Sequence, residues 1–342
     1  TTSSGTGPES AAGVSGGIDY GSYYIYTEAS YRNSGDNAEL MARFDFRCYT
    51  SPNINFIVHN YAEEYTPASI NLTVYNETDG QWSSSLWSLS ANWGNNWYYG
   101  PDWLSGAPLD LSAYAGKVIQ IWFNVTVTSY QGDFALDRIV VDATPRSSST
   151  WDGSAGSDWK TAANWSNNCV PLTTMDAVIA DVTTQPIISS DDGSSGAVTL
   201  DDITINSGAT LTIEKEASLT LTGNYTNNSG TVTLNSDSNE FASIKVGGTS
   251  SGNITYNRWV NSVSNGSGWD LIGSPVGGLS ISSFASTNDA PLATGGGSGS
   301  NQYAIGTYDN TQSSSTAAWE NYTSDGAGFT TNISAAGNFT KG

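Results

Sequence analysis

The sequence is poor in the residues on which many enzymes and nucleic-acid binders depend. Its 342 residues include 11 Lys and Arg, two Met, two Cys and one His, and the formal net charge is −21. Because phosphate binding needs clustered Lys and Arg, neither nucleic acid nor an anionic membrane is an expected partner. Catalysis of the Ser-His-Asp or Cys-His kind would depend on His59 alone, and the strand pattern around His59 favours a structural role.

Two cysteines, Cys48 and Cys169, are too few for a disulfide scaffold. A single bridge between them would join two modules, and this wide separation argues against it. No apolar run approaches the roughly 20 residues that a membrane-spanning helix needs, so no membrane insertion is expected. The chain starts without a signal peptide and ends without a finished terminal element, so we expect an exported protein that is a fragment or has been processed.

Aromatic and small polar residues are abundant by comparison. There are 12 Trp, 18 Tyr and 37 Gly, while only 13% of the residues are charged. Long surface helices normally need Glu, Lys, Arg and Ala, so this balance favours short strands joined by polar turns. The length suits two or three modules. The composition therefore predicts an all-β, multi-module protein.

Alternating segments between turn residues predict one β-sandwich over residues 18–143, after a Ser/Gly-rich lead-in at 1–17. The expected strands are 23–28, 53–60, 69–75, 117–128 and 134–141. Both faces are apolar in the first half of 118–125, which is typical of a central strand. Residues 144–150, with Pro145 and three serines, are the expected linker.

Residues 151–255 predict a Trp-rich cap followed by a short β-solenoid. Trp151, Trp159 and Trp165 lie close together in sequence, and large aromatic residues mostly serve burial. Three-residue strands then recur at 203–205, 211–213, 219–221, 232–234 and 244–246, separated by polar turns. Such spacing favours coils in which each strand stacks on the next. A C-terminal β region is expected over 256–342, with strand-like segments at 269–272 and 302–308.

The first module resembles the MAM domain, a jelly-roll sandwich of adhesive and receptor ectodomains. The resemblance covers roughly residues 17–143 and is carried by Gly21–Ser30, Ala38–Leu40, Cys48 leading into Phe56–Tyr61, Ile70–Tyr75 and Gly132–Ile139. The family usually has several cysteines in this domain, whereas this chain has only Cys48 there. Its disulfide pattern therefore does not carry over.

The remainder is similar to the stalk and terminal regions of Bacteroidota surface proteins, which are often exported by the type IX system. The similar segments are Thr150–Ser166, Asn206–Thr212, Gly223–Asn228, Tyr256–Trp259 and Trp269–Val276. The resemblance implies an extracellular, cell-surface location. The sorting domain in which such proteins usually end is absent from the sequence.

The same MAM resemblance implies a cation site. In such jelly rolls the acid after the first strand approaches the acid of the last strand, and these positions are Glu28 and Asp137, with Asp133 nearby. A hard cation such as Ca²⁺ would bridge the two strands and relieve the repulsion between the carboxylates. The alternative is that each carboxylate is exposed or hydrogen-bonded.

The densest aromatic stretch lies between residues 82 and 103. It contains Trp82, Trp87, Trp93, Trp97, Tyr98, Tyr99 and Trp103. Exposed Trp and Tyr rings stack on sugars by the same physics that makes them interface anchors, which predicts a ligand-binding surface. Some of these rings are expected to pack into the core instead.

These observations predict a non-catalytic surface protein for adhesion, whose jelly roll binds a glycan or a surface protein. The runner-up is a structural subunit that self-associates into an extracellular fibre, because exposed strand edges and solenoid ends can stack between copies. A glycoside-active enzyme is a minor alternative, since two carboxylates suffice for that chemistry. Its candidates are Glu63 with Glu64 and Asp133 with Asp137.

Overall fold

The computed structural model describes residues 25–29, 32–61, 67–90, 98–99, 108–130, 132–190, 196–259, 278–288, 302–308, 311, 319–323 and 332–339. It divides into two units, residues 1–259 and 260–342, and strands dominate the first. The predicted all-β class, with a jelly-roll-like sandwich followed by a solenoid, is confirmed.

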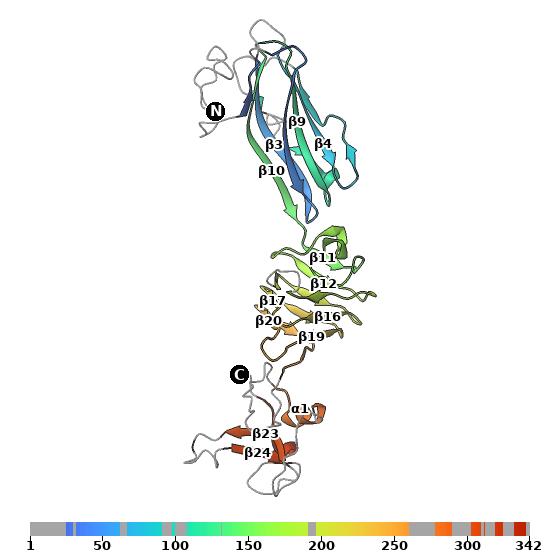
Figure 1. Ribbon diagram of the computed structural model, residues 1–342, viewed down its shortest axis with the longest axis vertical. Coiled ribbons are helices and arrows are strands. Elements are labelled where there is room, and N and C mark those ends of the chain that lie inside the picture. The colour runs from blue at the N-terminus through green and yellow to red at the C-terminus, as the bar shows by residue number, and fades with distance from the viewer. Residues whose placement is uncertain are drawn as a thin grey trace. The chain divides into compact units, whose positions relative to one another are not determined.

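Two antiparallel sheets form the sandwich (Figure 1). One has the order β1-β10-β3-β7, with β8 also paired to β3, and the other has the order β2-β9-β4-β5, with β6 also paired to β4. The first sheet is built from β1 (Ile25–Thr27), β3 (Tyr49–Tyr61), β7 (Tyr98–Tyr99), β8 (Leu109–Asp110) and β10 (Asp133–Pro145). The second is built from β2 (Asn37–Asp45), β4 (Ser69–Asn76), β5 (Gln81–Trp82), β6 (Trp87–Leu89) and β9 (Val118–Thr126).

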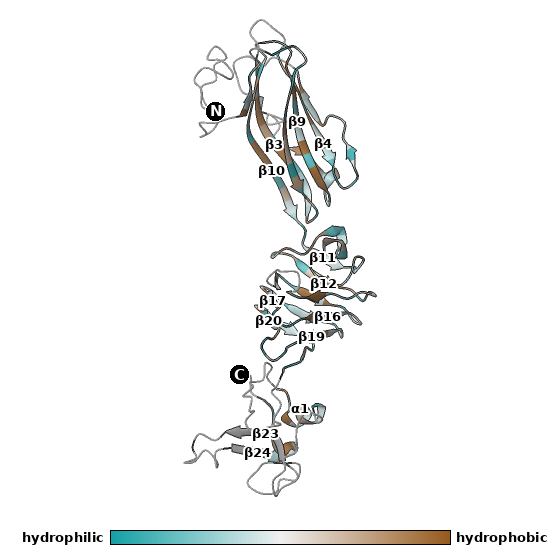
Figure 2. Ribbon diagram, viewed as in Figure 1, coloured by the Kyte–Doolittle hydropathy of each residue, from teal (hydrophilic) through white to brown (hydrophobic). Residues whose placement is uncertain are grey.

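Strict alternation of apolar and polar residues creates the sandwich core. In β4, Ile70, Leu72 and Val74 are fully buried, while the residues between them face outward, and Figure 2 shows the corresponding change of hydropathy along the strand. Strand β9 lies between β2 and β4, as its apolar first half predicts. Phe56 of one sheet meets Phe123 of the other edge to face, with ring centroids 4.9 Å apart.

The three cap tryptophans pack as one cluster, which confirms their predicted role. Trp151, Trp159 and Trp165 are at most 2% exposed, and Trp165 meets both of the others edge to face. The indole N–H of Trp151 donates to the carbonyl of Thr184, and that of Trp165 donates to the carbonyl of Trp159. Buried indoles need such acceptors, so the cluster combines apolar burial with hydrogen-bond satisfaction.

Three parallel sheets form the solenoid below this cap (Figure 1). Their orders are β11-β12-β15-β18-β21, β13-β16-β19-β22 and β14-β17-β20. Inward residues stack in columns, as Leu219 does on Ile244 and Leu211 on Val232. The strands are β11 (Ser148–Trp151), β12 (Asp176–Ile179), β13 (Ile187–Ile188), β14 (Ala197–Leu200), β15 (Ile203–Ile205), β16 (Thr210–Ile213), β17 (Ser218–Leu221), β18 (Tyr225–Asn227), β19 (Thr231–Leu234), β20 (Ser243–Val246), β21 (Ser250–Ser251) and β22 (Thr255–Tyr256).

A disulfide bond joins Cys48 to Cys169, with their Cα atoms 5.0 Å apart. The expectation that the two thiols stay unbridged is therefore wrong. Cys48 lies in the turn between β2 and β3, and strand pairing brings this turn beside the end of β10, where the Arg146 N–H donates to the Cys48 carbonyl. Of the segment expected as a linker, only Arg146 and Ser147 lie between β10 and β11.

The second unit contains a hairpin and a short helix among its described residues. Strands β23 (Gln302–Tyr308) and β24 (Trp319–Thr323) pair antiparallel, and α1 spans Ile281–Thr287. Ser280 caps α1 by accepting a hydrogen bond from the Ser283 N–H, and Phe284 packs edge to face on Phe339. The strand-like segment expected at 269–272 lies outside the described residues.

Candidate functional site

The three acids of the expected cation site lie at two separate positions along the paired strands β1 and β10. Thr27 is paired with Phe134, so Glu28 is level with Asp133, while Asp137 lies four positions further along β10, about 13 Å away. Asp133 is buried and accepts a hydrogen bond from the Ala29 N–H, and Asp137 accepts one from the Arg138 N–H. The structure therefore brings Glu28 near Asp133 but does not bring Asp137 to them.

Within the described part of the chain, no cluster of three or more acidic, histidine or cysteine side chains has the geometry to hold a metal ion. No helix found there is both long enough and apolar enough to pass through a lipid bilayer. His59 lies in β3 opposite Ala135. Glu63 and Glu64 lie outside the described residues.

The aromatic stretch at 82–103 divides between surface and core. Trp82 is 57% exposed at the end of the β4-β5 hairpin. Trp87 instead packs edge to face on Phe56 and belongs to the partly buried margin of the core. Tyr98 and Tyr99 form β7 against β3, whereas Trp93, Trp97 and Trp103 lie outside the described residues. Side chains are described for two of the predicted ligand-binding residues, and of these Trp82 lies on an open surface whereas Trp87 does not.

Two further aromatic residues surround Trp82. Tyr75 is its partner in the β4-β5 register, with ring centroids 5.1 Å apart, and the Trp122 ring of β9 meets Trp82 at 5.6 Å. All three side chains lie on the outward face of the second sheet. The cluster exists because β4 and β9 are adjacent and in register, with Thr73 opposite Trp122.

Amide and hydroxyl side chains continue this surface along β4 and β9. Asn71 lies opposite Asn124, and the Asn124 Nδ2 donates to Asn71 Oδ1 at 3.1 Å and to Thr73 Oγ1 at 3.0 Å. We call the whole surface the aromatic–amide face. It comprises Asn71, Thr73, Tyr75, Trp82, Trp122 and Asn124.

A chain of hydrogen bonds anchors the aromatic–amide face on one side. The Trp122 indole N–H donates to Gln120 Oε1 at 3.0 Å, and Gln120 Nε2 donates to Glu77 Oε1 at 2.7 Å. The Glu77 carboxylate also accepts a hydrogen bond from Arg43 Nε, with which it forms a salt bridge. The Gln120 amide and the Arg43 guanidinium hold the pKa of Glu77 below its usual value, so Glu77 is ionised at neutral pH and its charge is matched by Arg43.

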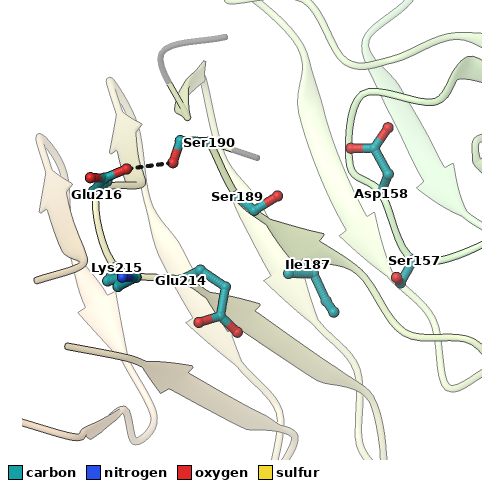
Figure 3. A pocket seen from close by; sticks show the side chains of 8 residues that line it. All are labelled: Ser157, Asp158, Ile187, Ser189, Ser190, Glu214, Lys215 and Glu216. Carbon is teal, nitrogen blue, oxygen red and sulfur yellow. Dashed lines mark hydrogen bonds between the residues drawn. The ribbon is translucent and has the colours of Figure 1, made fainter. Parts of the chain in front are cut away.

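A hollow lies on the solenoid, between the cap loop and the turn after β16 (Figure 3). This hollow of about 310 Å³ is lined by Ser157, Asp158, Ile187, Ser189, Ser190, Glu214, Lys215 and Glu216. Thr161 Oγ1 donates to Asp158 at 2.7 Å, Asn235 Nδ2 donates to Glu214, and Ser190 Oγ donates to Glu216 at 2.9 Å. Its carboxylates are thus already hydrogen-bonded, Asp158 within the cap loop and Glu214 and Glu216 to neighbouring coils.

Charges at the edge of this hollow also balance one another. Lys215 Nζ lies 2.5 Å from Asp237 Oδ2, and this hydrogen bond lowers the pKa of Asp237 to about 2. The carboxyl groups of Glu216 and Glu240 share a hydrogen bond, which lowers the pKa of Glu216 and raises that of Glu240. These pairs link one coil to the next, so their plain role is to stabilise the solenoid.

Sequence reasoning missed Tyr75, Trp122, Asn71 and Asn124. Their signal was the period of two in β4 and β9, where every second residue is a polar or aromatic residue facing away from the core. The pattern alone does not show that these side chains form one surface, because that requires knowing that β4 and β9 are adjacent.

A family model described as Domain of unknown function (DUF8693) matches residues 150–335. The match covers more than half of the chain, which therefore belongs to this family. It begins within β11, so it takes in the cap, the solenoid and most of the second unit. The sandwich, which contains the aromatic–amide face, precedes the matched region.

Proposed function

We propose that the chain is a non-catalytic, extracellular surface protein for adhesion, whose sandwich binds a glycan or a protein partner. The exposed Trp82 ring is the observation that carries the proposal. A large aromatic side chain that is 57% exposed, with Tyr75 and Trp122 beside it, is the kind of anchor that interfaces use. The solenoid behind it would hold the sandwich away from the cell surface.

Comparing two tryptophans tests this proposal. Trp82 of the sandwich and Trp259 of the solenoid are 57% and 49% exposed, so Trp82→Ala and Trp259→Ala remove similar exposed rings. We expect the full chain to be retained on a glycan array or on cells that it decorates, with retention lost in Trp82→Ala and kept in Trp259→Ala. Equal loss in both variants would count against a sandwich-borne adhesive surface.

A structural subunit of an extracellular fibre is the second candidate, favoured by the outer edge of β10. Beyond its bulge at Asp137/Val140, no described strand pairs with that edge. Beside it, an apolar hollow of about 180 Å³ opens between the two sheets, lined by Ile25, Leu40, Phe44 and Ile139 among others. An unpaired edge with an apolar groove can accept a strand from a second copy.

Electron microscopy of the native material distinguishes the two candidates. Fibres that disappear in Ile139→Lys, a change in the groove, but persist in Trp82→Ala would favour the structural subunit. Single particles together with ligand retention would favour adhesion.

A further inference from the structure

We infer that the aromatic–amide face binds an uncharged glycan, with sugar rings stacked on its aromatic side chains and sugar hydroxyls bound by its amides. The inference rests on the proposed adhesive function and names its ligand class. It assigns the ligand to the outward surface of β4, β5 and β9, to which Trp82 belongs among the described side chains of the stretch at 82–103.

Free polar atoms on the face match the chemistry of sugar hydroxyls. Within the described residues, the Asn71 amide nitrogen, the Asn124 carbonyl oxygen and the Tyr75 hydroxyl have no protein partner. A sugar hydroxyl both donates and accepts, so it needs donors and acceptors side by side. Asn71 and Asn124 provide one of each in directly opposite register positions.

These groups are already held in place before any ligand binds. Asn124 Nδ2 is fixed by Asn71 and Thr73, and the Trp122 indole is fixed by Gln120. All of them project from paired strands of one sheet and not from loops. Side chains ordered in advance lose little conformational entropy on binding, so a few directed contacts suffice for useful affinity.

The charges around the face favour a neutral ligand. Arg43 is its neighbouring cation among the described residues, and its guanidinium is paired with Glu77. The described part of the face therefore offers no unpaired cation to a carboxylate or sulfate group of an acidic glycan, and the net charge of −21 opposes such a chain at long range. The Glu77 carboxylate is equally satisfied, which leaves it a poor partner for an amino sugar.

Affinity electrophoresis of the full chain tests the inference. The gels would contain neutral polysaccharides (hydroxyethyl cellulose, xyloglucan, galactomannan or soluble starch), an acidic one (alginate) or a cationic one (chitosan). We expect retardation by at least one neutral polymer and none by alginate. Any retardation by chitosan, which the net charge of −21 favours at long range, should vanish in salt and be the same in Trp82→Ala. Trp82→Ala and Asn71→Ala should each raise the apparent Kd about tenfold, as truncation of an interface anchor residue does. Trp259→Ala should leave the apparent Kd unchanged. Unfolding midpoints should match, because Trp82 and Asn71 point away from the core.

Four outcomes would overturn the inference in distinguishable ways. Retardation by neutral polymers that both variants retain would place the glycan site elsewhere and leave the adhesive function standing. Retardation by alginate alone, or retardation by chitosan that persists in salt and is lost in Trp82→Ala, would overturn the neutral ligand class. If no polymer retards the chain but it captures a protein partner, and Trp82→Ala abolishes this capture, the ligand is a protein and not a glycan. If the chain binds neither, the adhesive function is overturned as well.

Discussion

Reducing the Cys48–Cys169 disulfide should destabilise the sandwich far more than the solenoid. If the sandwich unfolds while the solenoid stays folded, the unfolded chain from Cys48 to Ser148 is held at both ends, through Cys169 and through β11. Closing a loop of about 100 residues removes roughly 4.7 kcal/mol of chain entropy from the unfolded state at 25 °C, and measured values usually reach 2–5 kcal/mol. The solenoid, whose strands follow Cys169 except for β11, lacks this constraint.

The corresponding fall in the melting temperature of the sandwich is about 10–20 °C. Hydrogen exchange measured by mass spectrometry, with and without a phosphine reductant, would follow peptides of β3 and β4 separately from peptides of β16 and β19. We expect reduction to lower the free energy of opening in the first pair by at least about 2 kcal/mol and to change the second pair by less than about 0.5 kcal/mol.

The double variant Cys48→Ser/Cys169→Ser is the control for this measurement. It should behave like the reduced protein and should not respond to the reductant. Equal protection of β3 and β4 in the oxidised and reduced protein would refute the loop-closure reasoning. A loss confined to the solenoid peptides would refute the assignment of the constraint to the sandwich.

Three further outcomes follow from the cap and the solenoid. Leu219→Ala should lower the free energy of unfolding by about 2–5 kcal/mol in urea titrations, because Leu219 is fully buried, whereas the outward Thr220→Ala should change it by less than about 0.5 kcal/mol. Gly153→Ala should lower the melting temperature measured by circular dichroism, because φ is +62° there and a Cβ atom would overlap a backbone carbonyl; an unchanged melting temperature would contradict this. The Lys215–Asp237 pair stabilises the fold fully above pH 3.8, and this effect is lost as the pH falls toward the pKa of Asp237 at about 2. The difference in melting temperature between wild type and Asp237→Asn, measured between pH 2 and 6, should therefore shrink as the pH is lowered. A difference that stays constant would contradict the assignment.

The sequence was most informative where structure is local. The spacing of Ile203, Leu211, Leu219 and their repeats predicted five of the described solenoid strands (β15, β16, β17, β19 and β20) to within a residue, because each coil packs on its neighbours and repeats one pattern. The clustered cap tryptophans and the strand Gln302–Tyr308 were found for similar reasons. Strand β2 was missed, since its central residues, Ala-Glu-Leu-Met-Ala, have high helix propensity and pairing with β9 overrides it.

The candidate site depended on long-range pairing that no local pattern specifies. Trp82 could be singled out as aromatic, but its partner Trp122 lies 40 positions away and joins it only through the β4–β9 register. The disulfide was missed for the same reason. A separation of 121 residues argues against a bridge until the β2-β3 turn is known to lie beside the end of β10.

The bridge also changes the covalent topology of the molecule. Backbone and disulfide together close a ring from Cys48 to Cys169 that contains most of the sandwich and the whole cap. A protease that cuts one peptide bond anywhere inside this ring leaves both fragments attached to each other. Outside a cell, where proteases are common and reductants are scarce, the sandwich could be nicked in a surface loop and still remain covalently bound to its solenoid.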